Sequence, residues 1–252
     1  MSIKTAVVDG VATIEIARPE KKNAITRVMY TQLAVAFDAA RENPAVRAVL
    51  LTGQPGIFTS GNDIEDFVQR PSDEEPPSIA FMKALIGCDK PVIAAVTGAA
   101  IGIGTTMLLH CDFVYVSDEA RLAMPFVSLG LVPEFASSLV VPRLIGNARA
   151  AEKLLLGDPF TGADAVECGI ANAVLPASEV VKHARRVAER FNALPPGAVR
   201  ETKRLMRRGA SAAILDAIGV ERDIFAARLQ SPEAKEAFSA FFEKRKPDFS
   251  RF

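Results

Sequence analysis

The chain of 252 residues has few of the side chains that build metal sites and disulfide frameworks. It contains two histidines, three cysteines and no tryptophan. Cys88, Cys111 and Cys168 are odd in number and widely spaced, which argues against a disulfide framework and indicates reduced thiols. His110 and His183 lie far apart and give no zinc-like spacing, so no metal is expected. His110 is better explained as a satisfied core or helix-end histidine.

An excess of charge of either sign is also missing. Thirty Lys and Arg residues balance thirty Asp and Glu residues, which argues against a nucleic-acid partner or an anionic membrane surface. No apolar run has the length of a membrane span, and the first residues lack the apolar region of a secretory signal. The chain ends in SRF, unlike a peroxisomal SKL-type address. We therefore expect a cytoplasmic protein without a membrane partner.

The first half of the chain carries strand signals. Residues 4–17 form two β-rich runs around Asp9-Gly10, which predicts a hairpin. The apolar runs at 46–53, 91–98 and 112–117 are typical of buried strands. The proline-rich acidic segment 70–78 is expected to be a mobile surface loop.

Helix signals alternate with these strands and dominate after Thr161. Thr26 is expected to cap a helix, and Thr161 with Asp164 resembles a capping box. Ser178 and Ser231 are further N-cap candidates. Helices are expected near 178–193, 196–208, 211–229 and 232–246. The pattern predicts an α/β core followed by a helical C-terminal section.

Two turns rich in small residues follow buried strands. In residues 91–117, a glycine turn between two strands has the outline of a dinucleotide-binding unit, but Met107 stands where the third glycine is needed. A simpler interpretation is free backbone N–H groups at a helix start, suited to an anion or oxyanion. The segment FTSGNDI (58–64) could supply a second set of such donors. A tight turn without a ligand is the alternative for each.

A single carboxylate stands in the apolar stretch GLVPEFASS, residues 130–138. Such a carboxylate lies at the surface, is paired, or serves chemistry. From the stretch alone, a first-turn glutamate that gains from the helix dipole is the favoured interpretation of Glu134.

Segments over nearly the whole chain resemble the crotonase (enoyl-CoA hydratase/isomerase) superfamily. They are RPEKKNAIT (18–26), LLTGQPGIFTSGNDI (50–64), KPVIAAVTGAAIGIGTTMLLHCDFVYVSDEARLAMPF (90–126), LGLVPEFASSLVVPRLIG (129–146), GDPFTGADAVECGIANAVLP (157–176) and FFEKRKPDF (241–249). The resemblance implies an α/β fold, a spiral of β-β-α repeats in residues 1–193. It also implies a helical region, residues 194–252, that caps the CoA site and mediates assembly as a homotrimer or a dimer of trimers.

The resemblance assigns roles to several residues by position. It implies an oxyanion hole built from the backbone N–H groups of Ser60 and Ile103. Residues implied to contact coenzyme A are Lys22, Ala24, Ile25, Asp63, Ile64 and Lys246. Residues expected around the acyl chain are Phe67, Met82, Leu85, Phe126, Leu129 and Phe135. The substrate would be an acyl-CoA thioester, and no further cofactor is implied.

The reaction depends on which acids are present. Hydratases of this superfamily use two glutamates, and this chain has Thr106 and Phe126 at those places. Glu134 instead matches the base of Δ3,Δ2-enoyl-CoA isomerases, especially peroxisomal-type members, which serve fatty acid β-oxidation. The sequence therefore favours an isomerase in which Glu134 moves a proton and shifts a double bond from C3 to C2. A hydratase or another crotonase-type reaction is the first alternative. The second is a non-catalytic paralogue that binds acyl-CoA or RNA.

Overall fold

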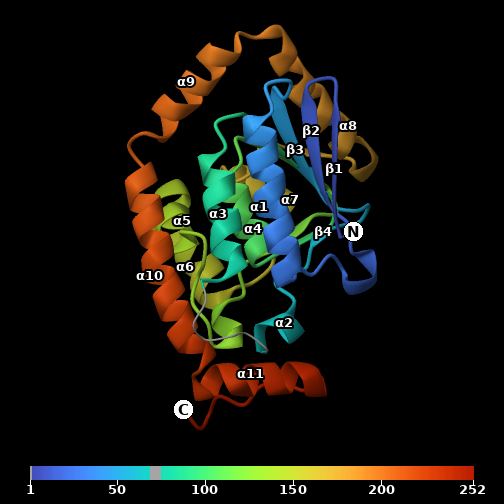
Figure 1. The fold of residues 1–252 in the computed structure, drawn as a ribbon. Helices are drawn as coiled ribbons and strands as arrows, with labels where there is room; N and C mark the ends of the chain where they lie inside the picture. The colour runs from blue at the N-terminus through green and yellow to red at the C-terminus, as the bar shows by residue number, and fades with distance from the viewer. Residues whose placement is uncertain (1, 69–74) are drawn as a thin grey trace.

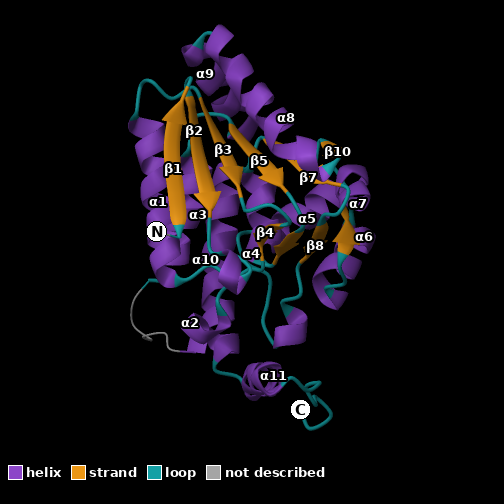
Figure 2. Cartoon of the chain, turned by 90° about the vertical axis from the view of Figure 1, so that its right-hand side faces the viewer, coloured by secondary structure: helices purple, strands orange, loops and turns teal. Residues whose placement is uncertain are grey.

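Strands alternate between two sheets along the chain (Figure 2). The computed structural model describes residues 2–68 and 75–252, without the side chains of Phe67 and Val68. The six-stranded sheet has the order β1 (Ile3–Val8), β2 (Val11–Ile16), β3 (Ala48–Thr52), β5 (Val92–Val96), β7 (Phe113–Ser117), β10 (Ala173–Leu175). The four-stranded sheet has the order β4 (Ile57–Thr59), β6 (Ala99–Ile101), β8 (Arg121–Ala123), β9 (Phe160–Thr161).

The chain therefore winds as a spiral. β3, β5 and β7 lie in the larger sheet, and each is followed by a strand of the smaller sheet. These strands pair in parallel with their neighbours, whereas β1 with β2 and β8 with β9 pair antiparallel. Parallel pairing brings equivalent turns of the spiral to the same edge, so loops distant in sequence become neighbours.

The N-terminal hairpin confirms the prediction for residues 4–17. Val8 pairs with Val11, and the two residues between them, Asp9 and Gly10, have φ of 48° and 73°. Two left-handed residues match the twist of the flanking strands, which is why Asp-Gly is favoured there.

The helices surround both sheets (Figure 1). In chain order the α-helices are α1 (Arg27–Glu42), α2 (Ile64–Val68), α3 (Pro77–Gly87), α4 (Ile103–Thr106), α5 (Ser137–Ile145), α6 (Asn147–Ala151), α7 (Gly162–Glu167), α8 (Ala177–Glu189), α9 (Pro196–Arg207), α10 (Ser211–Leu229) and α11 (Pro232–Glu243). Single turns of other types are η1 (Pro19–Lys21), η2 (Met107–His110), η3 (Val127–Leu129), η4 (Glu152–Leu156) and η5 (Arg190–Ala193).

Three of the predicted N-caps are confirmed and one is wrong. Thr26 accepts from the Met29 N–H, Ser231 accepts from the Ala234 N–H, and Thr161 forms a capping box with its partner. Ser178 lies inside α8, because that helix begins one residue earlier, after Pro176. Proline suits this place since its fixed φ leads into a helix and its missing N–H is not needed.

The predicted loop at 70–78 is too long. Residues 70–74 lie outside the described part of the chain, and α3 begins at Pro77. Two prolines in succession suggest a loop, yet the second stands at the first helical position, where proline is tolerated.

The central strands of the larger sheet, β3, β5 and β7, are buried on both faces, whereas the edge strand β1 is largely exposed. Along β3, Val49 and Leu51 belong to one core cluster, while Ala48 and Leu50 belong to another. The first cluster includes side chains of α1 and α3, and the second is covered by α8. Burial on both faces explains why these strands are continuous apolar runs in the sequence.

The C-terminal helices extend around the core (Figure 1). Lys203 and Arg207 of α9 lie 2.6 and 2.8 Å from the carboxylate of Asp112, which follows η2. α10 packs against α5, and α11 packs beneath η3, where Gly130 leaves no room for a Cβ against Ala234. Within the described residues, no helix has the length and apolar character that a membrane crossing requires.

Candidate active site

A pocket opens between the spiral core and α10. Its walls come from α1, α3, α10, the segment around β4 and the loop that precedes α5. Tyr30, Asn62, Met82, Glu134 and Glu221 all line it. Residues from five distant parts of the sequence thus meet at one edge of the spiral.

Glu134 is buried in this pocket, with 9% of its surface exposed. It lies in the loop between η3 and α5, three residues before the first residue of that helix. It is therefore not the first-turn helix glutamate that the sequence stretch alone favoured. Removal from water is the main cause that raises its pKa to about 8, and the charge of Glu221 adds to it.

Asn62 is the polar neighbour of that carboxyl group. Its side-chain Nδ2 donates to Glu134 Oε1 at 3.4 Å, which partly offsets the rise in the Glu134 pKa. Its Oδ1 accepts a hydrogen bond from the Tyr30 hydroxyl. Burial, together with the charge of Glu134, holds the pKa of Tyr30 well above its usual value, so that hydroxyl stays a neutral donor.

The turn after Glu134 has an unusual backbone. Phe135 and Ala136 have φ of 62° and 56°, a left-handed conformation that non-glycine residues seldom adopt in succession. His110 Nε2 lies 2.8 Å from the Phe135 carbonyl oxygen, and the two rings stack with centroids 4.1 Å apart. The buried Ser137 hydroxyl donates to the carbonyl oxygen of Glu134 at 2.7 Å.

His110 is therefore a satisfied core histidine, as the sequence indicated. Burial lowers its pKa to about 4, so the ring is neutral at physiological pH. A neutral ring has one N–H, and the carbonyl oxygen facing Nε2 requires the proton there.

Two glycine-containing turns lie side by side, and one of them leads into Asn62, which contacts Glu134. A Cβ on Gly61 would stand 2.9 Å from the Ile101 carbonyl oxygen, and Gly61 has φ of 95°. A Cβ on Gly104 would stand 2.6 Å from the Thr59 side chain. Glycine is required at both places because the loop after β4 and the start of α4 are in close approach.

Two backbone N–H groups in these turns have no acceptor among the residues that the structure describes. At the start of α4, the amides of Thr105 and Thr106 donate to Gly102 O, whereas the described residues offer no acceptor to Ile103 N. In the other turn, Ser60 N donates to Lys22 O at 3.1 Å. The Asn62 amide N–H has no acceptor within the described part of the chain.

The places where hydratases carry glutamates hold no acid. Thr106 is buried, and its hydroxyl lies 3.4 Å from Ile103 O. Phe126 is 4% exposed and belongs to the main core cluster. Neither side chain can take up a proton from water at neutral pH.

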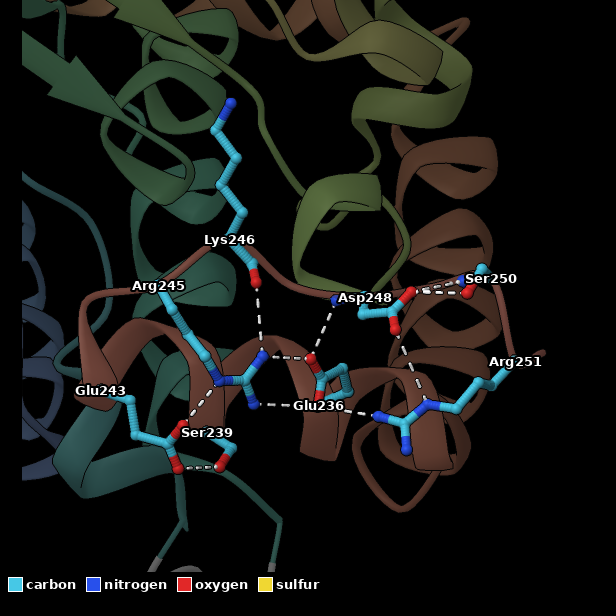
Figure 3. Close-up of polar contacts among 8 residues, drawn as sticks. All are labelled: Glu236, Ser239, Glu243, Arg245, Lys246, Asp248, Ser250 and Arg251. Carbon is cyan, nitrogen blue, oxygen red and sulfur yellow. Dashed lines mark hydrogen bonds and ion pairs between the residues drawn. The ribbon is translucent and has the colours of Figure 1, made fainter.

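Three of the residues expected to contact coenzyme A, Lys22, Ala24 and Ile25, run alongside the loop after β4. Ile25 forms a parallel bridge with Asn62 and accepts from the Asp63 N–H, and Lys22 O accepts from the Ser60 N–H. Figure 3 shows Lys246 in the segment after α11, its side chain extending away from the ion pairs that Arg245 makes with Glu236 and Glu243.

Asp63 is committed to a structural ion pair. Its carboxylate lies 2.5 Å from Arg18 Nη1. Burial would raise the Asp63 pKa, but the hydrogen bond and charge of Arg18 outweigh it and the pKa is lowered. A direct contact of this carboxylate with coenzyme A would compete with Arg18.

Of the residues expected around the acyl chain, Met82 and Phe135 line the pocket with Glu134. Leu85 and Phe126 are buried in the main core cluster, and Leu129 packs partly buried against it. The side chain of Phe67 lies outside the described part of the chain. No group of three metal-ligating side chains occurs among the described residues.

Sequence reasoning assigned no functional role to Tyr30, Glu221 or the side chain of Asn62. A signal was present for Glu221, because it follows Ile218 by three residues and precedes Phe225 by four on the buried stripe of α10. A glutamate at a core-facing position of a helix requires an explanation. Tyr30 and Asn62 carry no such signal, since tyrosine and asparagine are common at half-buried places.

A family model described as enoyl-CoA hydratase/isomerase matches residues 7–251 of the chain. The solved structure of OdaA from Pseudomonas aeruginosa is 52% identical, with a TM-score of 0.93 over 95% of this chain and 98% of that one.

Curated relatives carry both activities in their names. A probable enoyl-CoA hydratase of Bacillus subtilis is 29% identical over 98% of each chain. Enoyl-CoA delta isomerase 2 of Homo sapiens is 32% identical over 94% of this chain, which spans 62% of the human protein. The similarity covers the pocket and both glycine-containing turns, but the names do not separate isomerisation from hydration.

Proposed function

The chain belongs to the enoyl-CoA hydratase/isomerase family of acyl-CoA enzymes, and we propose that it is a Δ3,Δ2-enoyl-CoA isomerase with Glu134 as its acid–base residue. One observation carries the proposal. Glu134 is a buried carboxyl with a pKa of about 8, hydrogen-bonded to Asn62, whose own N–H has no acceptor among the described residues. A single such group can remove a proton and return it.

The first step removes a proton from C2 of a 3-enoyl thioester. The electron pair of the C2–H bond delocalises over C2 to C4 and the thioester oxygen, and the proton passes to Glu134. Backbone N–H groups stabilise the oxygen of this dienolate because they are fixed in place before the charge develops.

The donors proposed for that oxygen are the amides of Ile103 and Asn62. The sequence-based choice of Ser60 fits the structure less well, because its N–H donates to Lys22 O. The Asn62 N–H, two residues further on, has no competing acceptor among the described residues. Main-chain donors also explain why isoleucine is acceptable at position 103, which lies at a helix start.

The second step returns the proton to C4. The Glu134 carboxyl, protonated by the first step, donates to C4, and the double bond settles between C2 and C3 as a trans-2-enoyl thioester. Water takes no part, which agrees with the burial of Glu134 and of Phe135 beside it. Removing one oxyanion donor typically costs about 3–4 kcal/mol of transition-state stabilisation, and a positioned acid–base group contributes roughly 10²–10⁴ in rate.

Hydration is the second candidate, favoured by the name of the Bacillus subtilis relative. It requires one group to activate water at C3 and one to protonate C2. The pocket contains three further carboxylates, but each accepts hydrogen bonds from the protein: Glu221 from Ala136 and Ser138, Asp63 from Arg18, and Asp66 from the Arg27 N–H. A carboxylate with those bonds is poorly placed to exchange protons with water. A silent acyl-CoA-binding or RNA-binding protein would not need the raised pKa of Glu134.

An absorbance assay separates the two reactions. A 3-enoyl-CoA and, separately, a trans-2-enoyl-CoA are given to the protein, and the conjugated enoyl thioester is followed. Appearance of the chromophore from the first substrate supports isomerisation, whereas its loss from the second in water would support hydration instead.

The variant Glu134→Gln tests the base itself. Isomerisation should fall by roughly 10²–10⁴, while affinity for a CoA thioester stays near that of the wild type. A turnover equal to that of the wild type would mean that another group is the base.

Other expectations from the sequence stay predictions. They are coenzyme A contacts by Lys22 and Lys246, the division at residues 193 and 194, a homotrimer or dimer of trimers, and a cytoplasmic location. The acyl-CoA thioester is the substrate class, and the proposed proton transfer requires no further cofactor.

A further inference from the structure

The left-handed turn after Glu134 requires support from elsewhere in the fold. Each left-handed non-glycine residue is disfavoured by contact between its Cβ and the following carbonyl oxygen. Phe135 and Ala136 are two such residues in succession, and the helix α5 that follows has no side-chain cap of its own. Strained segments of this kind persist only where surrounding groups over-determine them.

Glu221 of α10 supplies that support from a distant part of the sequence. One carboxylate oxygen accepts from the Ala136 N–H at 2.6 Å, and the other accepts from the Ser138 N–H at 2.9 Å and from the Ser138 hydroxyl. These two N–H groups belong to the N-cap and the second residue of α5. Glu221 therefore caps a helix to which it is connected only through the tertiary fold.

The hydrogen bonds of Glu221 distinguish it from Glu134. Three donors converge on Glu221, while Glu134 receives one long hydrogen bond from Asn62. Burial raises the pKa of Glu221, while these hydrogen bonds act against that rise and hold the carboxyl group in one orientation. The two glutamates of the pocket thus have separate environments, one fixed by three donors and the other held by a single long hydrogen bond.

We propose that Glu221 is a positioning residue for catalysis: by holding the left-handed turn at Phe135 and Ala136, it sets where the Glu134 carboxyl stands relative to the substrate carbon atoms. The proposal rests on the function proposed above for Glu134. A fixed position matters because one carboxyl must reach both C2 and C4, and misplacement by about 1 Å can cost roughly 10²-fold in rate.

Glu221 also acts on Glu134 through its charge. It adds to the rise in the Glu134 pKa that burial causes, so loss of its charge should move the pH dependence of the reaction. Other titratable or charged groups that line the pocket or support the turn are Arg27 and Tyr30 of α1, Asp63 and Asp66 near β4, His110 of η2, and Arg222 of α10. All of them are retained in the variants below, so a change in pH dependence reports on Glu221.

Two substitutions separate position from charge. Glu221→Asp keeps the charge but shortens the side chain by one methylene, so its oxygens no longer reach both amides. Glu221→Gln keeps the length of the side chain but removes its charge. Its NH2 group then faces a backbone N–H, and two donors cannot form a hydrogen bond with each other. Asp216→Asn, an exposed position on the same helix, is the matched control and should behave as the wild type.

We expect kcat to fall by roughly 30- to 100-fold in both Glu221 variants, with KM within about threefold. The acid limb of the pH–rate profile should move to lower pH in Glu221→Gln and much less in Glu221→Asp. In a Glu134→Gln background, neither substitution should lower the residual rate further, because the effect passes through Glu134. Wild-type kcat in both variants, or the same loss in the Glu134→Gln background, would overturn the proposal.

If the Glu221 variants fold poorly, the variant Ser138→Ala tests the same proposal. It removes one of the three hydrogen bonds and retains the charge, and we expect kcat to fall by about three- to tenfold with an unchanged pH profile. Wild-type kcat in this variant would count against the proposal.

The two proposals fail in different ways. If Glu134→Gln retains wild-type turnover, the proposed function is wrong whatever Glu221 does. If Glu134→Gln abolishes turnover while both Glu221 variants retain it, only the role of Glu221 is wrong.

Discussion

The side-chain amide of Asn62 lies 3.4 Å from Oε1 of Glu134, and it is the hydrogen-bond donor that favours the ionised form of this buried carboxyl. The backbone N–H of the same residue has no acceptor within the described part of the chain. One asparagine thus contacts the base with its side chain and is proposed to contact the thioester oxygen with its main chain.

Replacing Asn62 by alanine should separate these two contacts. Asn62→Ala keeps the backbone N–H but removes the side-chain donor, so the apparent pKa of the base should rise and the rate at neutral pH should fall. Tyr30→Phe, which removes only the hydroxyl behind the asparagine, is the matched control with a smaller effect. pH–rate profiles of the three proteins check this, and an acid limb that moves to lower pH in Asn62→Ala would contradict it.

The wild-type reaction should be most active in alkaline solution. Glu134 must be ionised to accept the proton, and its pKa is about 8. Below that value, kcat/KM should fall by about tenfold for each unit of pH, because the ionised fraction falls by that factor. Initial rates between pH 6 and pH 10 measure the profile. An acid limb near the ordinary glutamate pKa would mean that the buried carboxyl is not the base.

The stability of the folded protein should fall as pH rises, whereas the reaction rate should increase. The pKa of Glu134 is about 8 in the folded protein against its ordinary value of 4.5, so the folded state holds the proton more tightly between these pH values. Its contribution is fully present below pH 4.5 and is lost as pH rises through 8. The stability of Glu134→Gln relative to the wild type should therefore rise by roughly 4–5 kcal/mol between pH 4.5 and a pH above 8. Urea denaturation at both pH values, with Asp216→Asn as control, tests the sign.

A proline at position 103 removes one proposed oxyanion donor. Ile103 is the first residue of α4, where proline is tolerated in a helix because no N–H is needed for the helix itself. Ile103→Pro should reduce kcat by roughly 10²–10³. Ile103→Val keeps the N–H and loses one buried methylene, so its kcat should stay within about threefold of the wild type. Equal rates in the two variants, with both folded by circular dichroism, would exclude the Ile103 amide from the reaction.

Lys203 should matter for stability and not for chemistry. It is buried, and its Nζ donates to Lys90 O and to Asp112 Oδ2, both at 2.6 Å. Lys203→Met leaves these acceptors without their donor and should cost about 2–4 kcal/mol of unfolding free energy. Arg204→Ala, which removes an exposed pair on the same helix, should cost about 0.5 kcal/mol or less. A catalytic defect in folded Lys203→Met would contradict a purely structural role.

Local signals in the sequence predicted much of the fold. The Asp9-Gly10 turn, the cap at Thr26 and the capping box at Thr161 are confirmed because each depends on residues a few positions apart. Continuous apolar runs indicated strands buried on both faces, as β3 is. The resemblance supplied the spiral, which no local signal contains.

The contacts of the site that join residues far apart in the sequence could not be predicted from local patterns. Asn62 and Glu134 are 72 residues apart, and Glu221 and Ala136 are 85 residues apart. Whether an amide is free is also invisible in a sequence. Ser60 and Asn62 differ in the structure because Lys22 O lies beside the first of them.

Because the strands alternate between two sheets, the backbone amides proposed to bind the substrate and the carboxyl proposed to react with it lie in different turns of the spiral. The amides proposed to bind the thioester oxygen lie in the turns after β4 and β6, whereas Glu134, the proposed acid–base residue, lies in the later loop before α5. Main-chain donors survive almost any substitution, while a carboxyl is gained or lost in one step. In a spiral of this kind, the loop that carries the acid–base side chain can therefore change by substitution, while the neighbouring turns continue to bind the same thioester group through their main chain.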